Sequence, residues 1–202
     1  MIPFPSIEAF HRLRLPEEGI SFAPKIKPHG TNAGVFAWAG DNNIVTPQSR
    51  NRVLTPEDDN YGFAAFAQEN REFFLDVAKE IGPHTLFGEW AGPGIQQGVA
   101  VSQIPERTLF VFAAHLGMAD AGVGAWWHFP QNLPEHPRIK VLPYETPFER
   151  VDPYNPGAFL ERVNALVGSC DETDPYILRE YGISGPGEGY VFYTQIGRAS
   201  CR

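Results

Sequence analysis

Residues 27–32 (KPHGTN) combine a lysine, a glycine turn and two small polar side chains, which are the residue types that covalent chemistry on a phosphate group requires. The amine of Lys27 would be the nucleophile. Because the ordinary pKa of a lysine is ~10.4, attack at neutral pH needs surroundings that favour the neutral amine. Gly30 would let the backbone approach a ligand closely. Such a string is often only a surface turn, and Lys25, on the same strand face, is a rival nucleophile.

The composition excludes several classes of protein. The chain has 202 residues, 43% of them hydrophobic, and a formal net charge of −8, which argues against a broad nucleic-acid-coating surface but leaves room for a basic cleft. No apolar run is long enough to cross a bilayer, and no secretion signal is present. Cys170 and Cys201 lack metal-ligand spacing, and the six histidines show no paired motif, so we expect no zinc site. We expect a cytoplasmic, monomeric protein without membrane contact.

The last residues do not look native. Residues 196–202 (IGRASCR) match the translation of a sequencing adapter, and the adapter's preceding bases would complete the codon of Gln195. We therefore expect native sequence to stop near Thr194, with 195–202 as an adapter-derived tail and a longer natural gene product.

The motif must be positioned by strands and helices, whose predicted order does not alternate regularly. This order predicts an α+β fold of antiparallel sheets flanked by helices, within one domain over residues 1–194. A helix is predicted to start at Thr55-Pro56 and to run to Gly82, with a phenylalanine stripe facing the core. Further helices are predicted from Asn155 and near 176–181. Strands are predicted over 20–27, 31–39, 44–46, 85–90, 108–114, 125–129, 138–144 and 188–194.

The 27–32 motif resembles the nucleotidyltransferase motif of the RNA ligase 2 family, the ATP-dependent nick-sealing ligases of phage and of mitochondrial RNA editing. Related DNA ligases and capping enzymes usually carry Asp at the position of His29, so the histidine favours the RNA branch. Further motifs follow in the family's order up to residue 194. The resemblance implies an adenylyltransferase domain in which Lys27, His29, Gly30 and Asn32 contact the nucleotide.

Two further segments resemble family motifs that bind the nucleotide. Residues 45–50 (VTPQSR) resemble the segment whose arginine binds the nucleotide or the RNA 5′-phosphate, which implies this role for Arg50; a guanidinium donates two parallel hydrogen bonds to phosphate. Residues 86–96 (LFGEWAGPGIQ) resemble the segment whose glutamate binds the ribose hydroxyl groups, which implies this role for Glu89.

The resemblance also implies a base-stacking residue and a metal ligand. It assigns base stacking to Phe112, although alternation puts Phe110 and Phe112 on one strand face, where core packing is the competing interpretation. Residues 188–191 (EGYV) resemble the fourth motif, so Glu188 would help to hold the catalytic Mg²⁺, directly or through water. A surface turn is the alternative for this segment.

The sequence departs from the family at three points. Ile26 stands where close members can have a glutamate that contacts adenine, which leaves base selection open. Ala113 stands where an aspartate is common. The fifth motif, a Lys-x-Lys strand that holds the triphosphate, would lie beyond residue 194, as would a C-terminal RNA-binding domain. We therefore expect the 202-residue chain to fold at least partly and to adenylate poorly.

The activity implied by the resemblance is ATP-dependent RNA ligation for RNA repair. Lys27 would form a lysyl-AMP intermediate with Mg²⁺, or with Mn²⁺, and the partners would be RNA ends or a nicked RNA duplex. Two alternatives stay open: a non-catalytic module that binds nucleotides or RNA ends, and a DNA ligase or capping-type nucleotidyltransferase. A pure binder has no need of a nucleophilic amine, and His29 disfavours the second alternative.

Overall fold

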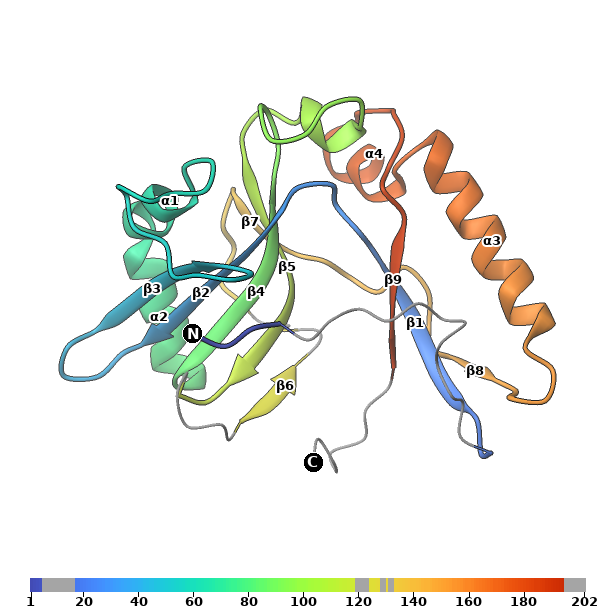
Figure 1. The fold of residues 1–202 in the computed structure, drawn as a ribbon, viewed down its shortest axis with the longest axis horizontal. Helices are drawn as coiled ribbons and strands as arrows, with labels where there is room; N and C mark the ends of the chain where they lie inside the picture. Colours follow the sequence, from blue (N-terminus) through green and yellow to red (C-terminus); the bar gives the residue numbers. More distant parts are fainter. Residues whose placement is uncertain (5–16, 119–123, 128–129, 131–132, 195–202) are drawn as a thin grey trace. The chain divides into compact units, whose positions relative to one another are not determined.

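The computed structural model describes residues 1–4, 17–118, 124–127, 130 and 133–194 (Figure 1). The predicted adapter tail, residues 195–202, lies outside the described residues. The chain divides into two compact units. The first comprises residues 1–5, 29–97 and 101–142, and the second comprises residues 6–28, 98–100 and 143–202.

The first unit contains a six-stranded mixed sheet in the order β3-β2-β4-β5-β6, with β7 beside β5. All pairs in this sheet are antiparallel except β5 and β7, which run parallel, so the predicted α+β fold of antiparallel sheets is confirmed with one parallel pair added. The strands are β2 (Thr31–Trp38), β3 (Ile44–Ser49), β4 (His84–Ala91), β5 (Thr108–Leu116), β6 (Ala125–Trp127) and β7 (Ile139–Val141). The short 3₁₀ helix η2 (Ala100–Gln103) precedes β5.

Helices α1 (Phe63–Glu69) and α2 (Arg71–Ile81) pack against this sheet. The predicted helix start at Thr55 is wrong. The Thr55 hydroxyl accepts a hydrogen bond from the Asp58 amide at 3.1 Å and so closes a turn, and α1 begins only after Gly62, which has a φ of 78°. A helix cannot continue through a left-handed residue. The helix also breaks at Asn70, whose φ and ψ of −104° and 24° are not helical.

The core of the first unit lies between the two helices and one face of the sheet. The predicted phenylalanine stripe is buried there at Phe63 and Phe66, which are 0% and 2% exposed. Facing them are Ala33 and Val35 of β2 and Leu86 and Trp90 of β4, with Leu109 and Val111 of β5. Because side chains alternate along a strand, the intervening residues of β2, β4 and β5 point to the opposite face of the sheet.

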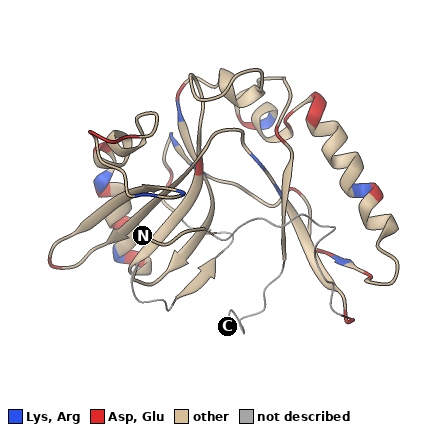
Figure 2. Ribbon diagram, viewed as in Figure 1, with Lys and Arg blue, Asp and Glu red and all other residues tan. Residues whose placement is uncertain are grey.

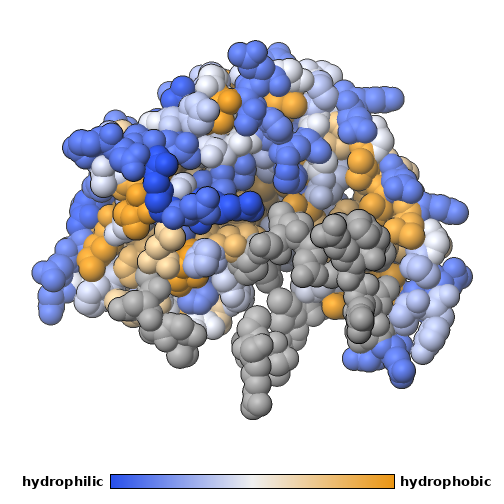
Figure 3. Space-filling model, in the orientation of Figure 1, coloured by the Kyte–Doolittle hydropathy of each residue, from blue (hydrophilic) through white to orange (hydrophobic). Residues whose placement is uncertain are grey.

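The second unit contains a three-stranded antiparallel sheet in the order β8-β1-β9, with helices α3 (Gly157–Glu172) and α4 (Pro175–Tyr181). Its strands are β1 (Ile20–Ile26), β8 (Glu149–Val151) and β9 (Tyr190–Thr194). Phe159 of α3 packs on Phe22 of β1. Apolar side chains lie at the surface in the region of α3 (Figure 3). Leu160 of α3 is a large apolar residue that is 36% exposed.

Charged residues of both signs are interspersed along α2 and α3, so these two helices present no purely basic face (Figure 2). Within the described ranges, none of the helices has the length and apolar character required to span a membrane.

Candidate functional site

Asn32 and Glu89 are directly opposite each other on the neighbouring strands β2 and β4. Directly opposed residues share a sheet face, and this face is the one that points away from α1 and α2. Both side chains are half-buried. The structure therefore brings the predicted nucleotide residues Asn32 and Glu89 together, although 57 positions separate 32 from 89 in the sequence.

Gly30 lies against the end of β4. A Cβ atom on Gly30 would come within 2.4 Å of the Trp90 carbonyl oxygen, so no other residue fits without a shift of the backbone. The Gly30 carbonyl accepts a hydrogen bond from the Gln96 side chain at 3.3 Å. The predicted turn at His29-Gly30 thus contacts the 86–96 segment, and His29, next to Gly30 in the chain, is half-buried.

Sequence reasoning missed two residues that hold the motif. Gln96 ends the 86–96 segment and has no predicted role, whereas in the structure its side-chain amide donates to the Gly30 carbonyl. Asn60 was assigned to a helix, whereas its side chain donates to the Thr31 hydroxyl at 2.9 Å. No local periodicity could have indicated either contact, because both partners are distant in sequence.

The Gly-Pro-Gly loop after Glu89 is fixed by Arg107. Its Nε donates to the Pro93 carbonyl at 2.9 Å, and its Nη1 donates to the Tyr61 carbonyl at 2.8 Å. Tyr61 has a φ of 53°, a conformation that is uncommon for a residue other than glycine. The Trp90 indole donates to the same carbonyl at 3.0 Å, so this strained residue is held from two sides.

Phe112 and Arg50 complete the predicted nucleotide residues of the first unit. Phe112 is half-buried on β5, and its ring packs edge-on against Phe4 at a centroid distance of 4.8 Å. Arg50 directly follows β3 and is exposed. Ser49 pairs with Ala33 in the register, so the next position along, Arg50, continues towards the Asn32 end of β2.

In the second unit, the ammonium group of Lys27 forms an ion pair with the Glu188 carboxylate. The Lys27 side chain is 42% exposed and that of Glu188 is 25% exposed. The Lys27 amide also donates to the Gly189 carbonyl at 2.9 Å, which extends the pairing of β1 with β9 by one residue. The predicted nucleophile and the predicted metal ligand therefore lie in direct contact.

Backbone hydrogen bonds hold the loop that carries Glu188. The Asp174 amide donates to the Gly185 carbonyl and the Gly187 amide to the Cys170 carbonyl, both at 2.8 Å. Asp174 is buried and caps α4 by accepting from two amides of its first turn. Its burial raises the pKa of its carboxyl group, while the two amides oppose that shift. Backbone hydrogen bonds thus join this loop to the end of α3 and the start of α4.

Lys25, the rival nucleophile, is fully buried, with 0% of its surface exposed. Its Nζ lies 4.7 Å from the ring centroid of Tyr144 and 5.3 Å from that of Tyr193. Burial lowers the pKa of Lys25 to about 7 from its ordinary 10.5. The lowered pKa suits a nucleophile, but a buried amine cannot reach a phosphate, so accessibility favours Lys27.

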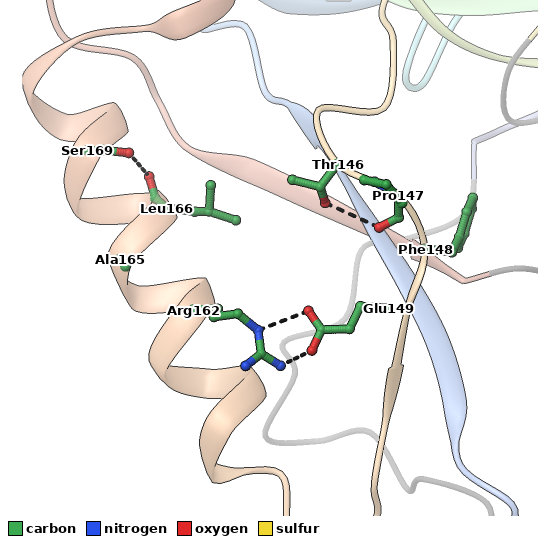
Figure 4. A pocket seen from close by; sticks show the side chains of 8 residues that line it. All are labelled: Thr146, Pro147, Phe148, Glu149, Arg162, Ala165, Leu166 and Ser169. Atoms are coloured by element: carbon green, nitrogen blue, oxygen red, sulfur yellow. Dashed lines mark hydrogen bonds and ion pairs between the residues drawn. The ribbon is translucent and has the colours of Figure 1, made fainter.

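The second unit also has a cavity of about 590 Å³ between α3 and the segment leading into β8 (Figure 4). The Glu149–Arg162 ion pair lies at its wall. The hydroxyls of Thr146 and Ser169 are bonded to backbone carbonyls nearby, so they offer no donor to a ligand. None of the predicted site residues lines this cavity.

Few protein side chains are available here to bind a divalent cation. Among the described residues, no group of three or more His, Cys, Asp or Glu side chains converges on one point. A lone carboxylate such as Glu188 fits Mg²⁺, which usually keeps several waters and binds one or two carboxylates together with substrate phosphates.

No protein-family profile matches the sequence, and no curated protein matches it. Solved structures do match, and those compared are RNA ligases from Naegleria gruberi. A mutant form with ATP and Mn is 17% identical with a TM-score of 0.60, and the match covers 98% of this chain and 54% of that chain. A second mutant in the apo state is 15% identical with a TM-score of 0.59 and the same coverage. The ligase with PPi is 16% identical with a TM-score of 0.53, covering 88% and 48%.

The chain spans about half the length of these solved structures. At this level of identity the likeness concerns the backbone arrangement. The mixed α/β chain, with its antiparallel strand pairs and flanking helices, is similar in backbone fold to about half of the Naegleria gruberi RNA ligase.

Proposed function

We propose that this chain is the adenylating part of an ATP-dependent RNA ligase that joins RNA 5′-phosphate and 3′-hydroxyl ends. The observation that carries this proposal is the contact between Lys27 and Glu188, which come from motifs at opposite ends of the sequence. The fold likeness to RNA ligases supports it, and so does the direct pairing of Asn32 with Glu89.

In the first step, the Lys27 amine attacks the α-phosphate of ATP. A nitrogen–phosphorus bond forms, the bond to pyrophosphate breaks, and the amine loses its proton to solvent. A carboxylate beside an ammonium group favours the charged, non-nucleophilic form, so the Lys27–Glu188 pair must separate before attack. Glu188 would hold Mg²⁺ or Mn²⁺, and the ion would neutralise charge on the transferring phosphate.

Four further residues of the predicted site would contact the nucleotide. Glu89 would accept hydrogen bonds from the ribose hydroxyls, and Asn32 would add a donor or an acceptor beside it. Phe112 would stack on the base, and Arg50 would bind phosphate. Such positioning is the main source of rate enhancement in phosphoryl-type transfers.

In the later steps, AMP passes from Lys27 to the 5′-phosphate of RNA, which becomes a good leaving group. A neighbouring 3′-hydroxyl then attacks that phosphate, seals the strand and releases AMP. Lys27 leaves the second step as a free amine and can react again.

The first test is covalent labelling. The 202-residue chain is incubated with Mg²⁺ or Mn²⁺ and ATP labelled at the α-phosphate, then denatured. We expect an acid-labile protein label that is absent in Lys27→Ala and retained in Lys79→Ala, an exposed lysine that pairs with Asp76 on α2. Because we expect this chain to adenylate poorly, only binding of ATP without any label at every pH between 6 and 10, combined with no sealing of a nick that already carries AMP, would favour the non-catalytic module.

A second test bypasses the triphosphate. A nicked duplex whose 5′ end already carries AMP needs no pyrophosphate release, so its sealing does not depend on contacts to the triphosphate. We expect this substrate to be sealed more efficiently than a phosphorylated nick with ATP. RNA should be sealed better than DNA of the same sequence; the reverse preference would favour a DNA ligase.

A further inference from the structure

The N-terminal residues 1–4 lie on the sheet face that carries Asn32 and Glu89. The side-chain amide of Gln48, which is 2% exposed, donates to the Ile2 carbonyl at 2.7 Å. Gln48 is opposite Gly34, and Gly34 is opposite Phe87, so these three residues share one face of the sheet. Phe87 precedes Glu89 by two positions and therefore shares its face as well.

The Phe4 ring enters an aromatic cluster on this face. Its centroid lies 4.8 Å from that of Phe112, 5.4 Å from Phe87 and 5.5 Å from Trp126. The interplanar angles to Phe112 and Trp126 are 70° and 86°, which is the edge-to-face geometry that aromatic pairs prefer. Phe4 thus contacts three rings contributed by three different strands.

Phe112 sits at a β-bulge of β5. In the pairing of β4 with β5, Gly88 is opposite Val111 and Phe87 is opposite Ala113, which leaves Phe112 without an opposite residue on β4. A bulge re-aims a side chain and disrupts the ladder locally. Phe4 is one of the side chains that pack on the Phe112 ring at this bulge.

We propose that Phe4 is a positioning residue that orients Phe112 for contact with the nucleotide base, which makes the N-terminal segment part of the nucleotide site. This inference rests on the proposed function, since it takes Phe112 as the base-stacking residue. A stacking ring must hold one orientation to gain contact area with a base, and an aromatic neighbour restricts its rotation. The cluster consists of uncharged aromatic rings, so we expect the Phe4 contact to have no effect on binding of the phosphate groups.

The test compares Phe4→Ala with Phe4→Trp and with the matched control Phe73→Ala. Phe73 is also a half-buried phenylalanine with two ring contacts, but it lies on α2, at the helix-covered face. Affinities for ATP and for inorganic pyrophosphate are measured by calorimetry, with thermal unfolding recorded for each variant. We expect Phe4→Ala to weaken ATP binding about three- to tenfold, with pyrophosphate binding unchanged and affinity restored in Phe4→Trp.

Phe73→Ala should lower the melting temperature and leave ATP affinity unchanged. Tighter ATP binding by Phe4→Ala would overturn the inference, because the segment would then compete with the nucleotide. Equal loss of ATP and pyrophosphate binding, or no loss of either, would overturn it as well. If the unsubstituted chain does not bind ATP, both the proposed function and this inference are wrong. If the chain binds ATP and Phe4→Ala does not change the affinity, only this inference is wrong.

Discussion

Gly187 lies against Cys170 so closely that a Cβ atom on Gly187 would come within 2.5 Å of the Cys170 Sγ. The Gly187 amide donates to the Cys170 carbonyl, and the next residue is Glu188, the partner of Lys27. The absence of a side chain at one position thus sets where the predicted metal ligand lies. Cys170 is buried, and burial raises the pKa of its thiol to about 11, so a thiol reagent should modify it slowly.

Gly187→Ala should displace the loop that carries Glu188 away from Cys170. We expect the rate of lysyl-adenylate formation to fall roughly 10- to 100-fold, since small misplacements of reacting groups have effects of this size. Alkylation of Cys170 should become faster at the same time. Both rates are measured in a Cys201→Ser background, so that Cys170 is the only thiol.

Adding Cys170→Ala to Gly187→Ala removes the Sγ atom and makes room for the new methyl group, so adenylation should recover in the double variant. Gly168→Ala in α3 is the control, because a Cβ there meets nothing within 4 Å. Unchanged adenylation and alkylation rates in Gly187→Ala would show that the contact does not position Glu188.

Lys27→Arg should abolish adenylation while keeping the fold. A guanidinium remains protonated at all accessible pH values and can still pair with Glu188, but it cannot act as a nucleophile. We expect a melting temperature within a few degrees of the original and no label from α-labelled ATP. Substantial labelling of Lys27→Arg would indicate that another residue, such as Lys25, forms the bond.

Gly30→Ala should destabilise the first unit by about 1–3 kcal/mol, because the new methyl group would overlap the Trp90 carbonyl and force a backbone shift. Urea unfolding measures the change. Gly157→Ala is the matched control, since its Cβ would make only an ordinary contact at 3.7 Å. If Gly30→Ala is as stable as the control, the close contact between Gly30 and the Trp90 carbonyl is wrong.

Lys25→Met should stabilise the chain more at low pH than at high pH. The pKa of Lys25 is about 7 when folded and 10.5 ordinarily, so between these values the unfolded chain binds the extra proton. The free energy of unfolding contributed by Lys25 therefore decreases as the pH falls from 10.5 to 7, and it is constant below 7. Methionine has no titrating group and a similar volume, so Lys25→Met removes this pH-dependent contribution to the free energy of unfolding.

Urea unfolding of both chains at pH 6, 8 and 10 measures the difference in free energy. The advantage of Lys25→Met should be smallest at pH 10 and largest at pH 6. Phe148→Leu, which changes the ring that packs on Tyr144 without touching a charge, should give a difference that does not vary with pH. A pH-independent difference for Lys25→Met would mean that Lys25 keeps its ordinary pKa in the folded chain.

The sequence by itself determined much of the local structure. Alternation and turn residues indicated β1, β2, β4 and β5 within a few residues, and the stripe at Phe63 and Phe66 correctly indicated a buried helix face. These signals are local, because the hydrophobic periodicity of a helix or strand is visible within a short window of neighbouring residues. The same local logic failed at Thr55, where a hydroxyl followed by proline and acids closes a turn and resembles a helix start.

Only the tertiary structure decided which of these residues meet. The contact of Lys27 with Glu188, the register of Asn32 against Glu89, and the support of Gly30 by Gln96 each join segments that no periodicity relates. The burial of Lys25 and the packing of Phe4 on Phe112 likewise depend on neighbours from other strands. The physical reason is that pairing register and side-chain packing are set by the complementarity of whole surfaces, which a chain acquires only when it folds.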